Sequence, residues 1–159
     1  MDSLIVFMAD VLVVPVVLLS MFFILKLPPA RRWQAIGRGI IVAVTALWFA
    51  KLASLMYQGV RPFVELGVDP KASYLANPGF PSDHALLVFA ASFVVLAATG
   101  NRKAALLLFS LAALVAIGRV MALVHSPMDV IGGFLCAAIA AVLWYGLSLR
   151  QTYYAPKSV

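Results

Sequence analysis

Apolar residues fill five long runs of the chain, and polar residues gather in the segments between them. A helix needs about 20 apolar residues to cross a bilayer. The third run is short for a span, which allows its helix to begin in the preceding loop. The pattern predicts an all-α, polytopic membrane bundle of about five transmembrane helices, forming one domain over residues 1–159. The runs are Leu4–Leu27, Ile36–Tyr57, His84–Thr99, Ala104–Val124 and Pro127–Leu149.

The composition also indicates a membrane protein. Of the 159 residues, 64% are hydrophobic and 11% are charged, and the mean hydropathy is +1.03. A soluble domain of this size is closer to half apolar and a quarter charged. The acidic start at Asp2, the length of the first run and the lack of a small-residue cleavage pattern predict a retained span, not a signal peptide. The single Cys136 excludes a disulfide framework or a cysteine metal site.

The basic residues predict how the spans are oriented. With five spans, the first connection, the third connection and the C-terminal tail share one side, which the positive-inside rule makes cytoplasmic. The N-terminus and the loop Gly59–Pro81 then face outward, and all six acidic residues lie in or toward that outer half. The net charge of +6 forms no amphipathic stripe, so a nucleic-acid partner is not expected. The basic residues in question are Lys26, Arg31, Arg32, Arg38, Arg102, Lys103, Arg150 and Lys157.

Polar residues with candidate chemistry lie at the predicted outer ends of the spans. Two helix starts there supply unpaired N–H groups and the positive end of the helix dipole, which favour anions. Two guanidiniums fit phosphate oxygens, and two imidazoles, the only ones in the chain, can divide nucleophile and acid roles in phosphoryl transfer. No cluster has metal-ligand spacing, so the predicted chemistry uses neither metal nor cofactor. The residues are Arg61, Ser82, Asp83, His84, Arg119, His125 and Asp129.

Three strings of these residues carry a family resemblance: Arg61-Pro62, then Pro81-Ser82-x-His84, then Arg119-x5-His125-x3-Asp129. In order and spacing they resemble the signature of the type 2 phosphatidic acid phosphatase superfamily. These membrane lipid phosphatases share a helical core with vanadium haloperoxidases. The wording R-P-F-V and F-P-S-D-H looks most like the undecaprenyl diphosphatase branch, the bacitracin-resistance type.

The resemblance implies a reaction and a role for each matching residue. His125 would attack phosphorus to form a phosphohistidine, and Asp129 would orient its ring. His84 would protonate the departing lipid phosphate. The substrate would be undecaprenyl diphosphate, cleaved to undecaprenyl phosphate and phosphate at the outer face of a bacterial inner membrane. The phosphate oxygens would be held by Arg61, Arg119, Ser82 and backbone N–H groups near Asp83.

Several positions depart from the family pattern. The lysine usually found seven residues before the arginine is Ser54 here, and Lys51, one turn earlier, is the candidate replacement. Lys51 has an alternative, a pairing with Asp10 inside the membrane. Gly118 replaces the serine that usually precedes the second arginine, and Asp83 stands where glycine is commoner. The family core usually has six spans, whereas this chain is expected to have five and to lack one N-terminal helix. The absence of that helix would change the lipid entrance or promote homo-oligomerisation.

Structural roles and other functions compete with this interpretation. Ser126-Pro127-Met128-Asp129 is also a helix-start pattern, and Ser82 can cap the third span. Both arginines can reach lipid headgroups by snorkelling, His84 can be an interfacial histidine, and Glu65 is a further candidate contact of the site. Phosphatidylglycerol phosphate, phosphatidic acid and lipid A are alternative substrates. A small transporter or channel is the alternative from another class.

Overall fold

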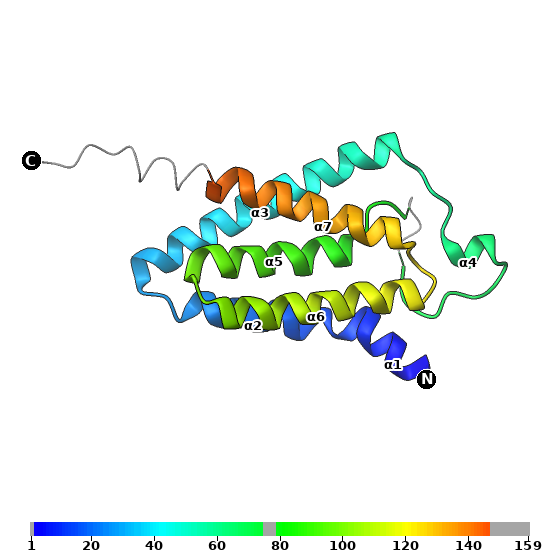
Figure 1. Ribbon diagram of the computed structural model, residues 1–159, viewed down its shortest axis with the longest axis horizontal. Helices are drawn as coiled ribbons and strands as arrows, with labels where there is room; N and C mark the ends of the chain where they lie inside the picture. The colour runs from blue at the N-terminus through cyan, green and yellow to red at the C-terminus, as the bar shows by residue number, and fades with distance from the viewer. Residues whose placement is uncertain (1, 75–78, 147–159) are drawn as a thin grey trace, which may run out of the picture.

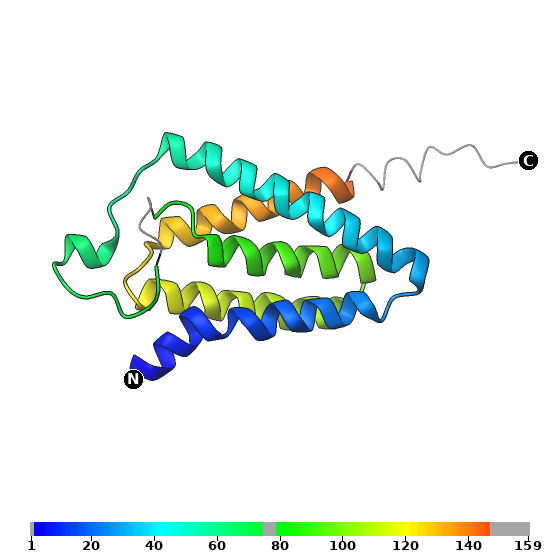
Figure 2. The same ribbon diagram turned by 180° about the vertical axis from the view of Figure 1, so that it is seen from behind.

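The computed structural model describes residues 2–74 and 79–146, and within these residues it is helical without strands. The helices form an elongated bundle (Figures 1 and 2). The predicted tail residues Arg150 and Lys157 lie outside the described residues. In chain order the elements are α1 (Asp2–Val6), η1 (Phe7–Val11), α2 (Val13–Leu25), α3 (Pro29–Met56), α4 (Pro62–Glu65), α5 (Asp83–Thr99), α6 (Arg102–Met121), α7 (Pro127–Ala141) and η2 (Val142–Gly146), where η marks a π-helix.

The five predicted runs all form helices, which confirms the all-α membrane bundle. Four helical segments are long and apolar enough to cross a bilayer: Asp2–Leu25, Pro29–Met56, Arg102–Met121 and Pro127–Gly146. The third run forms α5, which has 17 residues and lies between the other helices, in contact with α2, α3, α6 and α7. It does not extend into the preceding loop, because Ser82 has an extended backbone and its side chain caps the helix at Ala85 N.

Small and β-branched side chains fill the centre of the bundle, while large apolar side chains face outward. Val16, Val42 and Leu108 are fully buried. Leu106 and Trp48, by contrast, expose 69% and 63% of their surfaces. A soluble monomer rarely exposes so much contiguous apolar surface. The exposed side chains are therefore accounted for by a lipid environment.

The bundle has two ends with opposite charge. What we call the α4 end comprises α1, η1, α4 with the described residues of the loop after it, the first turns of α5 and α7 and the last turn of α6 (Figure 1). The opposite, basic end comprises the α2–α3 and α5–α6 connections and η2. All six acidic residues lie at the α4 end, in agreement with the predicted segregation, and they are Asp2, Asp10, Glu65, Asp69, Asp83 and Asp129.

Candidate active site

The segment that carries Arg61 is fastened to the turn between α6 and α7. Leu123 in this turn has φ +62°, a left-handed conformation that is uncommon for residues other than glycine. This conformation ends α6 and turns successive carbonyls toward α4 and the following loop. The hydrogen bonds are Lys71 N to Ala122 O (3.2 Å), Phe63 N to Leu123 O (3.0 Å) and Arg61 Nη1 to Val124 O (2.7 Å).

The same turn leads into the first residues of α7, where His125 and Asp129 meet. Ser126 caps the helix: its hydroxyl accepts a hydrogen bond from Asp129 N (3.2 Å), and Asp129 Oδ2 accepts one from Ser126 N (2.7 Å). That carboxylate oxygen also lies 3.5 Å from His125 Nδ1. Nδ1 is buried and has no hydrogen-bond partner among the described residues. Asp129 therefore caps its helix and also faces the histidine.

Close backbone contacts bring the starts of α5 and α7 together. Ser82 N donates a 2.9 Å hydrogen bond to the Asp129 carbonyl. A Cβ atom on Gly133 would lie 2.6 Å from Ser82 O, so only glycine allows this approach of α5 to α7. Ser82 is fully buried and caps α5, as the sequence pattern allowed. The N-termini of α5 and α7 thus lie side by side. Unpaired N–H groups at helix N-termini favour the binding of anions.

Arg61 lies directly beside this junction. A Cβ atom on Gly79 would be 3.2 Å from Arg61 Cγ and 3.4 Å from Asp129 Oδ2, which places that glycine between the two side chains. Arg61 is 8% exposed, and its Cζ lies 5.4 Å from the centre of the Tyr74 ring. Burial lowers the pKa of the Arg61 guanidinium, while the nearby carboxylates of Asp129 and Asp83 act in the opposite direction. An arginine in such surroundings stays charged near neutral pH.

Arg119 completes the group from the last turn of α6. It is 1% exposed, and its Nη1 donates a 2.7 Å hydrogen bond to Asp10 Oδ1 within an ion pair. Its Nε is buried without a hydrogen-bond partner among the described residues. His84 at the start of α5 is half-buried and lies within electrostatic range of Arg119, Asp10 and His125, and Arg61 lies within the same range of Arg119. The structure thus gathers both histidines and both arginines at the α4 end.

Asp10 is the site residue whose role sequence reasoning missed. Its alternative pairing with Lys51 is not found, because Asp10 lies in η1 and binds Arg119, while its Oδ2 accepts a hydrogen bond from Ser73 N (2.9 Å). Its neighbourhood also explains Gly118. A Cβ atom there would lie 2.7 Å from Ala9 N, so the serine usual in the family would clash with η1. The signal in the sequence was an acid within an apolar run, but its partner could not be read from it.

The remaining candidate residues lie at the edge of this group. Lys51 is exposed and, together with Asp83, Ser54 and Gln58, lines a separate pocket of about 290 Å³ between α3 and the start of α5. Lys51 is thus near the site without an ion pair to a described residue. Glu65 at the end of α4 is exposed and makes no ion pair with a described site residue.

Fold and site together define a membrane-embedded helical bundle with a buried group of histidine, arginine and aspartate side chains at one end. The sequence model of the PAP2 superfamily matches residues 35–153, and the chain belongs to this family of phosphatases. The family assignment agrees with the resemblance seen in the three sequence strings. It makes the gathered side chains the candidate active site of a membrane phosphatase.

Similar proteins carry related names. The chain is 29% identical to undecaprenyl-diphosphatase BcrC of Bacillus subtilis, over 93% of the chain and 75% of that protein. It is 31% identical to the putative undecaprenyl-diphosphatase YbjG of Escherichia coli, over 92% of the chain and 75% of that protein. It is also 31% identical to the bacitracin transport permease protein BcrC of Bacillus licheniformis, over 66% of the chain and 52% of that protein. No solved structure matches the chain.

Proposed function

We propose that this protein hydrolyses the terminal phosphate of a lipid diphosphate, and that the lipid is undecaprenyl diphosphate. The observation that carries the proposal is the group of two arginines and two histidines beside two helix N-termini, on a membrane-embedded bundle. The names of two similar proteins favour an undecaprenyl substrate. The products are undecaprenyl phosphate and inorganic phosphate.

In the proposed reaction, His125 is the nucleophile. Its Nδ1 faces Asp129 Oδ2, so a proton on Nδ1 leaves the lone pair of Nε2 for attack on phosphorus. The new N–P bond forms as the bond from phosphorus to the bridging oxygen breaks. His84 gives a proton to that departing oxygen. A water molecule then gives a proton to His84 and attacks the phosphohistidine, so that the N–P bond breaks, phosphate is released and both histidines are restored. Asp129 stabilises the positive charge on the ring.

The arginines and helix starts hold the phosphate oxygens as charge develops on them. Arg61, Arg119, the Ser82 hydroxyl and the N–H groups near Asp83 are the proposed donors. The buried Nε–H of Arg119, which has no partner among the described residues, is available for one oxygen. Asp10 is proposed as a positioning residue, because it holds the other side of the same guanidinium. Lys51, on the neighbouring pocket, is proposed to contact the second phosphate.

The proposed location is a bacterial inner membrane, with the α4 end and the N-terminus outside and the C-terminus in the cytoplasm. The basic residues at the other end support this orientation by the positive-inside rule. Labelling of a cysteine introduced at Asp69, in the exposed loop after α4, tests it. A membrane-impermeant maleimide is expected to label whole cells, and labelling only after lysis would reverse the orientation.

Phosphate release by the purified full chain tests the reaction. Undecaprenyl diphosphate is expected to be hydrolysed in EDTA, and His125→Ala and His84→Ala are expected to lose the activity. Trp48→Phe, on the lipid-facing surface, serves as a matched control that keeps it. Full activity in both histidine variants, or a strict need for magnesium, would contradict the proposal. Parallel assays with phosphatidylglycerol phosphate, phosphatidic acid and lipid A decide the substrate.

A further inference from the structure

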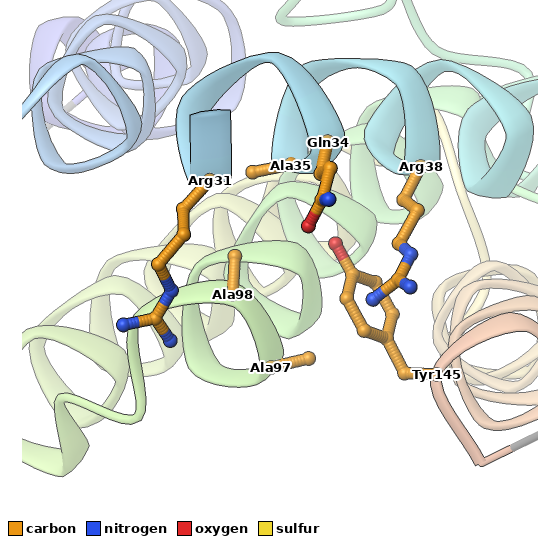
Figure 3. Close-up of a pocket in the computed structure, with 7 residues that line it drawn as sticks. All are labelled: Arg31, Gln34, Ala35, Arg38, Ala97, Ala98 and Tyr145. Atoms are coloured by element: carbon orange, nitrogen blue, oxygen red, sulfur yellow. The ribbon is translucent and has the colours of Figure 1, made fainter. Parts of the chain in front are cut away.

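A second polar pocket lies at the basic end, at the far end of the bundle from the candidate active site. It has a volume of about 140 Å³ and is formed by the first turns of α3, the last turns of α5 and η2. Its polar lining consists of Arg31, Gln34, Arg38 and Tyr145, and Ala97 and Ala98 of α5 form its floor (Figure 3). The proposed hydrolysis uses none of these residues.

The polar side chains of this pocket are arranged around a common space. Arg31, Gln34 and Arg38 follow one another at helical spacing on one face of α3. Figure 3 shows the Gln34 amide and the Tyr145 hydroxyl directed toward each other, with the Arg38 guanidinium beside Tyr145. Arg38 Cζ lies 5.8 Å from the centre of the Tyr145 ring. The small side chains of Ala97 and Ala98 leave room for a group between the two arginines.

Two features of this pocket call for an anion from outside the chain. First, all six Asp and Glu side chains lie at the α4 end, so none can neutralise Arg31 or Arg38. Second, the Tyr145 hydroxyl is buried and has no hydrogen-bond partner among the described residues. A buried polar group without a partner destabilises the protein, and a ligand that accepts its hydrogen bond would offset this cost.

We propose that this pocket binds a phosphate group, with an anionic phospholipid headgroup as its source. Guanidiniums match phosphate oxygens with paired N–H donors, and the Tyr145 hydroxyl and Gln34 amide add neutral donors. Basic pockets between membrane helices bind anionic headgroups in this way. The bound phosphate links α3, α5 and η2 at the end of the bundle where the described residues form no ion pair with one another.

The proposal is tested by measuring the binding of phosphatidylglycerol to the purified full chain with native mass spectrometry. Arg31→Gln combined with Arg38→Gln is expected to weaken binding about 25-fold, since each basic residue contributes about fivefold. The matched control, Arg102→Gln with Lys103→Gln, removes the same charge from the same end outside the pocket and is expected to cost less than half as much in free energy. Equal losses in the two double variants would overturn the proposal.

Tyr145→Phe provides a test without a change of charge. Loss of a hydrogen bond to a charged group weakens binding by about tenfold. Tyr57→Phe, at the α4 end, is the matched control and is expected to bind normally. Binding by Tyr145→Phe equal to that of Tyr57→Phe would overturn the proposed donor set. All these variants are expected to keep the hydrolytic activity, which shows that they are folded.

Two further ligands separate the sources of the phosphate. Phosphatidylcholine has the same diester phosphate without net negative charge and is expected to bind at least tenfold more weakly than phosphatidylglycerol. Millimolar inorganic phosphate that displaces phosphatidylglycerol, and that loses this effect in the Arg31→Gln, Arg38→Gln variant, would identify free phosphate as a ligand of the same pocket. If the binding of phosphatidylglycerol and the binding of inorganic phosphate are both independent of Arg31 and Arg38, the pocket is not a phosphate site.

Discussion

Arginines stand at both ends of this bundle, but their surroundings differ. At the α4 end, Arg61 and Arg119 are 8% and 1% exposed, and each binds an acceptor within the protein, the Val124 carbonyl and the Asp10 carboxylate. At the basic end, Arg31 and Arg38 are exposed, and no Asp or Glu side chain lies near them. The fold therefore supplies internal acceptors for the arginines at the α4 end, whereas the two arginines at the basic end are open to acceptors from outside the chain.

This difference in burial suits the two ends to different roles, fixed donors for a reaction at the α4 end and adaptable contacts with lipid headgroups at the basic end. A buried guanidinium loses its hydration, so it is stable only where carbonyls and carboxylates replace the lost water. Donors that are fixed in advance stabilise developing charge without reorganising during the reaction. Exposed guanidiniums adapt instead to headgroups of the bilayer. Parallel substitutions at the two ends test this contrast.

The largest expected difference is in kcat/KM, between the variants Arg119→Lys and Arg38→Lys. Lysine keeps the charge but lacks the planar fork that pairs with Asp10 and is proposed to hold a phosphate oxygen at the same time. Arg119→Lys is expected to lower kcat/KM about 100- to 1000-fold, comparable with the loss of one oxyanion donor. Arg38→Lys is expected to leave it unchanged. Initial rates of phosphate release measure both, and equal rates in the two variants would remove Arg119 from the proposed site.

Asp10→Asn tests the internal partner of Arg119. The amide preserves the shape but not the charge, so Arg119 is held less firmly, and a misplaced donor can cost up to about 100-fold in rate. The expected loss is in kcat more than in KM, because the guanidinium is proposed to act on charge that grows in the transition state. Asp10→Glu, which keeps the carboxylate, is expected to recover part of the lost kcat. A loss of thermal stability with unchanged kcat would show that Asp10 has only a structural role.

Glycine substitutions compare packing at the two ends. A Cβ atom on Gly118 would lie 2.7 Å from both Ala9 N and Met8 Cβ, whereas one on Gly37 in α3 would meet nothing within 4 Å. Gly118→Ala is expected to destabilise the protein by about 1–3 kcal/mol, since η1 must shift. Gly37→Ala is expected to stabilise it by about 0.5–1 kcal/mol. Thermal unfolding in detergent measures both, and stabilisation by Gly118→Ala would contradict the close packing of η1 on α6.

The sequence predicted the helices well because each apolar run is long. The predicted end of the fifth run, Leu149, lies outside the described residues. Among the boundaries that the structure describes, the largest error is the start of α3, at Pro29 instead of Ile36, because the polar residues of its first turns hid a helix that begins where proline favours a start. The end of α6 at Met121 instead of Val124 follows from the left-handed Leu123, which no apolar pattern reveals.

The candidate site was predictable as a set of residues but not as a set of contacts. Motif spacing brought out His84, His125 and Arg119 because each lies at the end of an apolar run. The pairing of Asp10 with Arg119 joins residues 109 positions apart. It depends on how two helices are rotated about their axes, and the π-helix η1 shifts that rotation within an otherwise uniform apolar segment.

The smallest expected difference compares two helix caps. Ser126 accepts a hydrogen bond from Asp129 N at the start of α7, and Asn101 accepts one from Ala104 N at the start of α6, at the basic end. Ser126→Ala and Asn101→Ala are each expected to cost about 1 kcal/mol of stability, the usual effect of losing a cap. Only Ser126→Ala is expected to lower kcat, by about two- to fivefold, because Asp129 also faces His125 and a looser first turn orients that ring less well. Rates are compared well below both unfolding temperatures, so that the stability loss itself has no effect on activity. An equal fall in kcat for both variants would mean that the caps act through the whole bundle, and the contrast between its two ends would not extend to single hydrogen bonds.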